Sequence, residues 1–315
     1  MKYQHLFGPV ASRRLGISLG LDLVPYKYCP LNCVYCEVQR TTHLSTERSE
    51  FFALADILAE LDSFLKDSPQ LDHITFSGAG EPTLYLRIGE IIRHIKTRYP
   101  QYKLALLTNS VLFPDPGIRR DCLPCDVVLP SLDAVSQDVY EKINRPRAGL
   151  RSSDLIEGLK QFRKEYSGKI WLEVFILPGV NDTEQEVYLL RDTIAELRPD
   201  IVQINSLDRP GAEDWVEAAS PESLSRIRDI FAETLPMPVE IIAKAEYIKA
   251  EHPVDAVAGE LIQSILVRRP CTAEDLASML NLHINEISKI LRRYSAEGLI
   301  SSHRETRGVF YVWKS

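Results

Sequence analysis

The chain has 315 residues, of which 45% are hydrophobic and 26% are charged, and this ordinary globular composition excludes a disordered or low-complexity protein. The 37 Lys and Arg residues against 44 Asp and Glu residues give a net charge of −7, which argues against coating of nucleic acid or an anionic membrane by bulk charge. No apolar run approaches the roughly 20 residues of a membrane span, and the N-terminus lacks a signal-peptide core. We therefore expect a cytoplasmic protein without a membrane partner.

Strand-like and helix-like segments alternate over the first 240 residues, which is typical of βα units around a parallel sheet. Amphipathic helices are predicted between the strands, for example at 52–65, where apolar residues recur with a 3.6-residue period. Thr183 with Glu186 predicts a capping box at a helix start, and Ser220 before Pro221 predicts another. Six βα units result, and their predicted strands are residues 17–23, 73–77, 103–108, 127–132, 170–176 and 201–206.

The last sixty residues have a different pattern. We expect a first domain at 1–244, a linker at 245–254 and a second domain at 255–315. Three helices are predicted in the second domain, of which Thr272 caps the second and Asn285 opens the third, and a hairpin follows. This order predicts a winged helix-turn-helix domain.

The predicted third helix and wing carry basic residues that would suit phosphate contact. These residues are Lys289, Arg292, Arg293, Arg304 and Arg307. However, residues 255–315 hold eight Lys and Arg against seven Asp and Glu, so the domain is nearly neutral. Docking of a protein or peptide, and packing within the chain, therefore stay open beside binding of nucleic acid.

Polar residues stand where several predicted strands end. Asn109, Ser131 and Asp133 follow the third and fourth strands, and Glu173 lies within the otherwise apolar fifth strand. Catalytic groups of parallel α/β barrels collect at the C-terminal ends of the strands, although a single Ser or Asn there can equally cap a loop. The pattern predicts a site at this edge.

Three of the six cysteines, Cys29, Cys33 and Cys36, fall within eight residues. In a long chain of a reducing compartment, clustered thiols are more often metal ligands than disulfides. Zinc usually takes four ligands in two separated pairs, whereas three thiolates on one short loop suit a cubane iron-sulfur cluster with one iron open to a further ligand. Tyr35 would place an aromatic ring beside that iron.

Other reactive residues are expected to lie outside the site. Cys122 and Cys125 come just before the fourth strand and supply only two ligands, so we expect them to be structural. Several arginines could meet an anionic substrate or form a solvated face. They are Arg13, Arg14, Arg145, Arg147 and Arg151.

The spacing Cys-x3-Cys-x2-aromatic-Cys is the signature of the radical S-adenosylmethionine (radical SAM) enzymes, and the sequence resembles that family. The resemblance implies an α/β fold with a partial (β/α)6 TIM-like barrel and a 4Fe-4S cluster on the three cysteines, whose fourth iron is chelated by SAM. It also implies a low-potential electron donor of flavodoxin or ferredoxin type, reductive cleavage of SAM, and a 5′-deoxyadenosyl radical that abstracts hydrogen from a substrate.

The run from Ser77 to Glu81 resembles the family's Gly-Gly-Glu segment, which binds the amino group of SAM. Its glycines would let the backbone approach a ligand. By strand position, Asn109 and Ser131 resemble groups that contact the ribose or carboxylate of SAM. The full set of expected cofactor-binding residues is Tyr35, Gly78, Gly80, Glu81, Asn109, Ser131, Asp133 and Glu173.

Four further segments resemble an Fe-S oxidoreductase branch related to the tRNA wybutosine synthase: residues 7–16, 129–134, 143–146 and 171–174. This resemblance implies a tRNA base as the substrate, with a peptide or protein as the alternative. A hypothesis from another class is an iron-sulfur, redox-responsive DNA-binding regulator. The glycine-rich turn and the polar strand ends favour an enzyme, because a sensor needs no SAM pocket.

Overall fold

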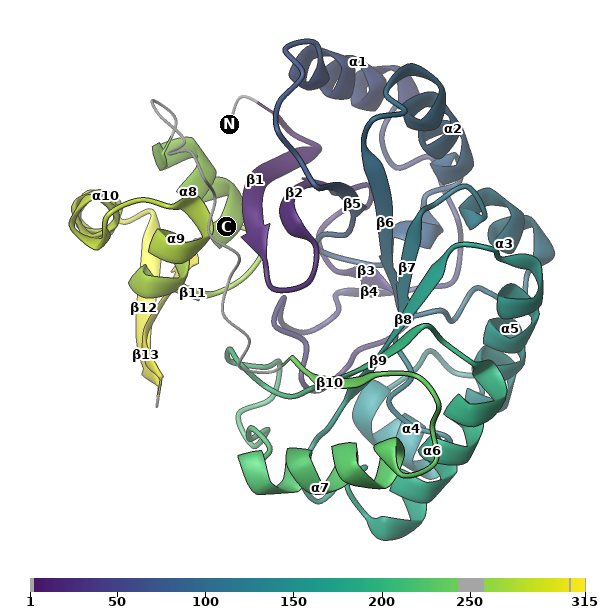
Figure 1. Cartoon of the computed structure of the whole chain (residues 1–315). Coiled ribbons are helices and arrows are strands. Elements are labelled where there is room, and N and C mark those ends of the chain that lie inside the picture. Colours follow the sequence, from purple (N-terminus) through teal and green to yellow (C-terminus); the bar gives the residue numbers. More distant parts are fainter. Residues whose placement is uncertain (1–2, 243–257, 306, 315) are drawn as a thin grey trace.

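The first part of the chain folds around one curved and mostly parallel sheet (Figure 1). The computed structural model describes residues 3–242, 258–305 and 307–314. Its large sheet contains, in chain order, β1 (Leu6–Ser12), β2 (Gly16–Leu21), β5 (His73–Phe76), β6 (Lys103–Thr108), β7 (Val127–Pro130), β8 (Lys169–Phe175), β9 (Ile201–Asn205) and β10 (Val239–Ile241). The spatial order is β1-β2-β5-β6-β7-β8-β9-β10; β1 pairs antiparallel with β2, and all other neighbours are parallel.

Helices cover the outer face of this sheet, and two short strands form a separate pair. The helices are α1 (Leu54–Leu65), α2 (Ile88–Arg98), α3 (Pro116–Cys122), α4 (Gln137–Asn144), α5 (Ser152–Glu165), α6 (Glu184–Leu197) and α7 (Pro221–Ala232), with a 3-10 turn, η1 (Pro82–Leu84). The separate pair is β3 (Tyr28–Cys29) with β4 (His43–Leu44). In α1 the predicted apolar stripe faces inward, since Leu54, Ile57, Leu61 and Leu65 are all buried.

The six predicted strands and their six βα units are confirmed. The edge strands β1 and β10 were missed, as was the short helix α4, which precedes α5 between β7 and β8. A register shift between Phe7 and Val10 breaks the alternation of β1, and β10 has only three residues, so neither gives a clear period-2 signal.

The predicted capping box of α6 is half right. The Thr183 side chain accepts from the Glu186 N–H, but the Glu186 carboxylate turns to the loop after β7. There it accepts from the Val135 and Ser136 N–H groups at 2.5 and 3.1 Å. Glu186 therefore joins α6 to the loop at the end of β7 instead of completing its own helix cap.

Residues 258–314 form a second unit beside the sheet. It contains α8 (Ala258–Leu266), β11 (Cys271–Thr272), α9 (Ala273–Leu280), α10 (Ile284–Ala296), β12 (Ile300–Glu305) and β13 (Gly308–Trp313), and its strands pair in the order β11-β13-β12. The three helices and the hairpin were predicted, and Thr272 caps α9 as expected. The cap of α10 is His283, whose ring accepts from the Asn285 N–H, so Asn285 is inside the helix.

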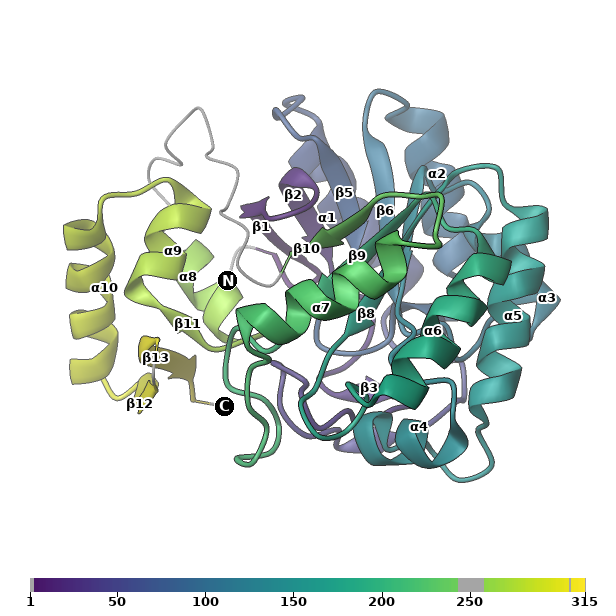
Figure 2. The same ribbon diagram turned by 60° about the horizontal axis from the view of Figure 1, so that its bottom comes forward.

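The second unit packs on the edge of the sheet. α8 and α9 contact β1, as both views show (Figures 1 and 2). Val10 of β1 belongs to the same hydrophobic cluster as Leu276 and Ile287. The predicted linker at 245–254 lies outside the described residues. None of the described helices has the length and apolarity that crossing a membrane requires.

Two arginines of the β1–β2 turn reach across the open side of the curved sheet. Arg13 donates to the Ile242 carbonyl at 3.3 Å, and Arg14 contacts Glu173 of β8 at 2.5 Å. These contacts join the β1–β2 edge of the sheet to β8 and to the residue that follows β10. Neither arginine belongs to a solvated face.

Candidate functional site

The three clustered cysteines are free thiols on the loop that follows β2, and each sulfur accepts a hydrogen bond from a nitrogen donor. Asn109 Nδ2 donates to Cys29 at 3.4 Å and Asn144 Nδ2 to Cys33 at 3.3 Å. The third donor, Lys27 Nζ, lies 3.1 Å from the sulfur of Cys36. Such donors stabilise a thiolate, which is the form of cysteine that binds metal.

The sulfurs of Cys29 and Cys33 need a positive partner to ionise. Burial, and then the negative charge of Cys33, raises the pKa of the Cys29 thiol well above its usual value. Burial and the charges of Asp133 and Cys36 raise the pKa of Cys33 to about 12. Iron supplies such a charge, and soft sulfur donors favour iron-sulfur clusters, so the donor set fits a 4Fe-4S cluster. In the described part of the chain, no three His, Cys, Asp or Glu side chains lie close enough together to bind one metal ion. This is compatible with a 4Fe-4S cluster, because each of its irons takes only one cysteine thiolate.

Asp133 is the centre of a buried hydrogen-bond network beside the cysteines. Its carboxylate accepts from Tyr35 Oη at 2.5 Å, Asn144 Nδ2 at 2.8 Å and the Phe175 N–H at 3.0 Å. Burial raises the pKa of Asp133 to about 6 despite these donors. The Tyr35 ring stacks on Phe175, with 3.8 Å between centroids. Asp133 thus fixes both the aromatic ring of the cysteine motif and the amide that bonds Cys33.

Glu81 is bonded within the protein, which gives it a positioning role. It is buried, and its carboxylate accepts from the Thr83 hydroxyl at 2.6 Å, the Thr108 hydroxyl at 2.7 Å and the Asn109 N–H at 2.8 Å. Burial raises its pKa, and these donors partly offset that effect. Glu81 therefore ties the loop after β5 to the end of β6, where Asn109 reaches Cys29.

The glycines of the same loop permit close approach of other parts of the chain. At Gly78, with φ +150°, a Cβ would lie 2.1 Å from the carboxylate of Asp22. At Gly80 a Cβ would lie 2.1 Å from the carbonyl oxygen of Tyr28, the residue before Cys29. The space on the Cβ side of both glycines is therefore filled by the β2 end and the cysteine loop, so neither position has room for a side chain.

A small cavity of about 30 Å³ brings together five of the predicted site residues, namely Cys33, Tyr35, Asn109, Ser131 and Asp133. This volume matches one water molecule, so the cavity takes an atom or two of a ligand and not a whole SAM. Glu173 is not in its lining; besides Arg14, it contacts Asn205 Nδ2 at 3.3 Å.

Sequence reasoning missed several residues of this region. Asn144 ends α4 and Tyr140 lies one turn earlier, and both line the small cavity. Asn144 stands in the segment 143–146, which the family resemblance singled out without assigning it a role. No sequence pattern pointed to Lys27, because it lies in an irregular loop, where its backbone has a positive φ. The two other clustered thiols, Cys122 and Cys125, are part of the hydrophobic core.

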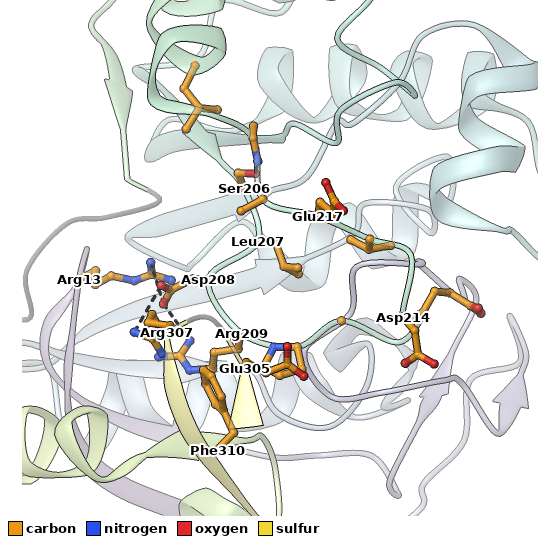
Figure 3. Close-up of a pocket in the computed structure, with 17 residues that line it drawn as sticks. Arg13, Ser206, Leu207, Asp208, Arg209, Asp214, Glu217, Glu305, Arg307 and Phe310 are labelled. Carbon is orange, nitrogen blue, oxygen red and sulfur yellow. Dashed lines mark hydrogen bonds and ion pairs between the residues drawn. The ribbon is translucent and has the colours of Figure 1, made fainter. Parts of the chain in front are cut away.

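A much larger cavity, of about 870 Å³, lies between the loop after β9 and the hairpin of the second unit (Figure 3). Its walls include Asp208 and Arg209 from the loop and Phe310 from β13. Its acidic lining residues Asp214, Glu217 and Glu305 are exposed, and no sequence pattern had indicated them. Ser206, which lines this cavity, directly follows the C-terminal end of β9. Catalytic groups collect at the C-terminal strand ends in such folds.

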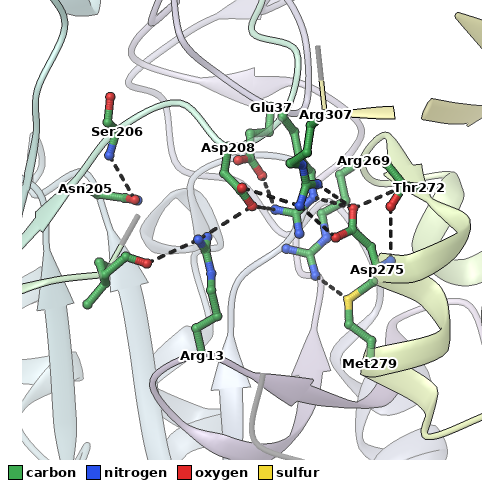
Figure 4. A network of polar contacts seen from close by, with 12 residues as sticks. Arg13, Glu37, Asn205, Ser206, Asp208, Arg269, Thr272, Asp275, Met279 and Arg307 are labelled. Atoms are coloured by element: carbon green, nitrogen blue, oxygen red, sulfur yellow. Dashed lines mark hydrogen bonds and ion pairs between the residues drawn. The ribbon is translucent and has the colours of Figure 1, made fainter. Parts of the chain in front are cut away.

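A network of ion pairs connects the cysteine loop to the second unit (Figure 4). The Arg209 side chain is 0% exposed and lies 2.9 Å from Glu37 and 3.7 Å from Asp275, which is in the first turn of α9. Burial alone would raise the pKa of Glu37, but the guanidinium groups of Arg209, Arg269 and Arg13 hold it below its usual value.

Arg307 belongs to the same network and contacts Asp275 at 2.6 Å and Asp208 at 3.4 Å. The charge of Arg307 is thus paired with two carboxylates, although its side chain is 39% exposed. The other four basic residues predicted on the third helix and wing are exposed: Lys289, Arg292, Arg293 and Arg304.

The profile of the radical SAM superfamily matches residues 23–190, which contain the cysteine loop and the strands from β5 to β8. The chain belongs to the radical SAM superfamily. It is therefore an enzyme, and the cofactors of radical SAM enzymes are a 4Fe-4S cluster and SAM. Such enzymes generally need a reductant.

Individual relatives extend the similarity beyond the matched region. The chain is 30% identical to a UPF0026 protein of Methanocaldococcus jannaschii over 97% of its own length and 95% of the relative. It is also 30% identical to the GTPase Obg of Brachyspira hyodysenteriae over 95% of its length, but there it spans only 44% of the relative. SuiB of Streptococcus suis, solved with bound S-adenosylmethionine, shares the fold at 16% identity, with a TM-score of 0.52 over 69% of this chain and 48% of SuiB.

Proposed function

We propose that Cys29, Cys33 and Cys36 hold the 4Fe-4S cluster at the end of a partial (β/α)6 barrel. When bound, the cluster would supply one electron for cleavage of a carbon–sulfur bond of SAM to methionine and a 5′-deoxyadenosyl radical, which would abstract a hydrogen atom from the substrate. The observation that carries this proposal is that the three sulfurs each accept a hydrogen bond from an amide or ammonium donor.

The surrounding residues divide into contacts and supports. We propose that Asn109, the Ser131 hydroxyl and the backbone at Gly78 and Gly80 contact SAM. Among the described residues no partner is recorded for the Ser131 hydroxyl, which leaves it available to a ligand. The remaining predicted residues, Tyr35, Glu81, Asp133 and Glu173, support these contacts through the hydrogen bonds and ion pair already described.

The test is anaerobic reconstitution with iron and sulfide. We expect close to four irons per chain and reductive cleavage of SAM to 5′-deoxyadenosine, both of them abolished by Cys33→Ala. Cys125→Ala is the matched control, because Cys125 is a buried core thiol outside the site. A wild-type chain that takes up zinc and cleaves no SAM would contradict the proposal, and so would a Cys33→Ala variant with full activity.

For the substrate we propose a tRNA base, presented by residues 258–314 acting as a winged helix, in line with the resemblance to the wybutosine synthase branch. Support comes from the exposed basic side chains of Lys289, Arg292 and Arg293 on α10 and Arg304 on β12. Exposed cations on a helix of this kind suit phosphate contact. Mass spectrometry of tRNA nucleosides from a deletion strain tests this, and an unchanged nucleoside profile would contradict it.

A basic peptide is the second candidate, because the exposed acidic residues Asp214, Glu217 and Glu305 at the large cavity would repel a polyanion and attract a cation. The two candidates respond differently to charge reversal. Arg292→Glu should weaken tRNA binding and flatten its salt dependence, whereas Glu217→Lys should weaken binding of a lysine-rich peptide. If the protein were instead a DNA-binding regulator, it would bind an operator sequence and would not cleave SAM.

We propose a flavodoxin or ferredoxin as the electron donor in the cytoplasm, a compartment that suits the free cysteines of this chain. Reduction of the reconstituted enzyme by purified flavodoxin and its reductase, followed by detection of 5′-deoxyadenosine, tests the donor. Cleavage supported by dithionite but by neither carrier protein would contradict it.

A further inference from the structure

Tyr140 of α4 has a buried hydroxyl that lacks a hydrogen-bond partner. The side chain is buried and lines the small cavity together with Cys33 and Asn144. Three other buried tyrosines, Tyr85, Tyr102 and Tyr166, donate to backbone carbonyls. Tyr166 donates to the Cys125 carbonyl and Tyr102 to the Pro69 carbonyl, each at 2.8 Å.

An unpaired hydroxyl in the interior costs free energy, because it has left water without gaining a partner. Phenylalanine would avoid that cost at the same shape. The carboxylate of Asp133, which lines the same cavity, is already bonded to Tyr35, Asn144 and the Phe175 N–H. The hydroxyl of Tyr140 is thus a buried donor without an acceptor, on a side chain that lines the same cavity as Cys33.

We propose that Tyr140 is a positioning residue whose hydroxyl donates a hydrogen bond to a sulfur of the bound 4Fe-4S cluster on the side of Cys33. The inference rests on the proposed cysteine ligands. It adds a fourth donor to the three that the cysteine sulfurs accept from Lys27, Asn109 and Asn144. Hydrogen bonds to the sulfurs stabilise the more negative, reduced cluster and so raise its reduction potential.

The test is an EPR-monitored redox titration of the reconstituted Tyr140→Phe enzyme without SAM. We expect a more negative midpoint potential than in the wild type, and a tenfold fall in the ratio of reduced to oxidised cluster would correspond to about 59 mV. Tyr166→Phe is the matched control and should leave the midpoint unchanged, because its hydroxyl bonds a carbonyl in the core. An unchanged midpoint in Tyr140→Phe, or a shift seen only with SAM present, would overturn the proposal.

A second readout covers a variant that loads its cluster poorly. In the protein without cluster, Tyr140→Phe should unfold at the same temperature as the wild type or higher, whereas Tyr166→Phe should unfold at a lower temperature. The stabilisation gained on cluster binding should be smaller in Tyr140→Phe than in the wild type. A lower unfolding temperature of cluster-free Tyr140→Phe would contradict the proposal. A wild-type chain without an iron-sulfur EPR signal would instead overturn the ligand assignment.

Discussion

The guanidinium of Arg209 lies 2.9 Å from the carboxylate of Glu37, the residue that directly follows Cys36. The same side chain is 3.7 Å from Asp275 of α9. One buried cation thus neutralises an acid on the cysteine loop and an acid on the second unit. The placement of the two parts of the chain is therefore coupled to the geometry of the cysteine loop.

Replacing this cation should destabilise the fold. Arg209→Met removes the cation that lies 2.9 Å from Glu37, while Asp275 keeps its ion pair with Arg307, and breaking a buried ion pair from one side costs about 3–5 kcal/mol. The free energy of unfolding, measured by chemical denaturation, should fall by this amount, and iron uptake should fall with it. Arg40→Met is the control, since Arg40 is 68% exposed and its pair with Glu213 is worth about 1 kcal/mol or less. Equal effects of the two substitutions would refute the role of Arg209.

Gly80 should not tolerate a side chain. In Gly80→Ala the new Cβ would overlap the backbone of Tyr28, which has to move and would displace the neighbouring Cys29. We expect lower iron content after reconstitution together with reduced stability. Gly149→Ala is the comparison, because a Cβ there meets nothing within 4 Å and the positive φ of +91° alone costs on the order of 1–3 kcal/mol. Its iron content should equal that of the wild type. Full iron content in Gly80→Ala would show that the loop contact is dispensable.

The ion pair between Asp22 and Arg268 should couple the sheet to the second unit. Arg268 Nε lies 2.9 Å from Asp22 Oδ2, and the other oxygen of Asp22 accepts from the Ala79 N–H at 3.2 Å. Burial raises the pKa of Asp22, and Arg268 opposes that shift. Asp22→Asn and Arg268→Met should each lower the free energy of unfolding. The double variant should lower it by about 0.5–3 kcal/mol less than the sum of the two single effects. Strict additivity in this double-mutant cycle would exclude a direct interaction.

Acid should weaken the fold through His73, the first residue of β5. Burial lowers the pKa of His73, whose Nδ1 lies 2.7 Å from the Leu15 carbonyl oxygen. The folded state therefore binds fewer protons at this site than the unfolded state, so stability falls as the pH drops through the unfolded value of about 6.5. The free energy of unfolding, measured with urea, should fall less between pH 7.5 and pH 5.5 in His73→Asn than in the wild type. The lowered pKa of His5 contributes equally to both proteins. Identical losses would leave His73 without a role in acid destabilisation.

The parallel part of the sheet could be predicted because its strands are short apolar runs between amphipathic helices. In β5, for example, all four residues from His73 to Phe76 are buried, and a turn-rich segment follows. The edge strand β1 carries no such signal, since half-buried residues and a bulge interrupt its pattern. Packing of β1 between β2 and the second unit decides its conformation, and such contacts are not local in sequence.

The candidate site was predictable where chemistry follows local spacing. Cys29, Cys33 and Cys36 are recognisable because three ligands occur within eight residues. The donor to Cys33 is Asn144, 111 residues away, and no spacing rule links the two. Glu81 was found by its motif, but its donors Thr108 and Asn109 come into reach only in the folded chain, so its part in holding the loop could not be inferred.

The second unit also has a consequence for how this protein can be handled. Its core includes Val10 of β1, and its helices α8 and α9 cover the strand that ends the sheet. A fragment cut at residue 244 would leave that apolar side chain and an unprotected strand edge in contact with water, which is a template for pairing between molecules. Truncated preparations should aggregate, so soluble expression of the first 244 residues is a poor route to the enzyme.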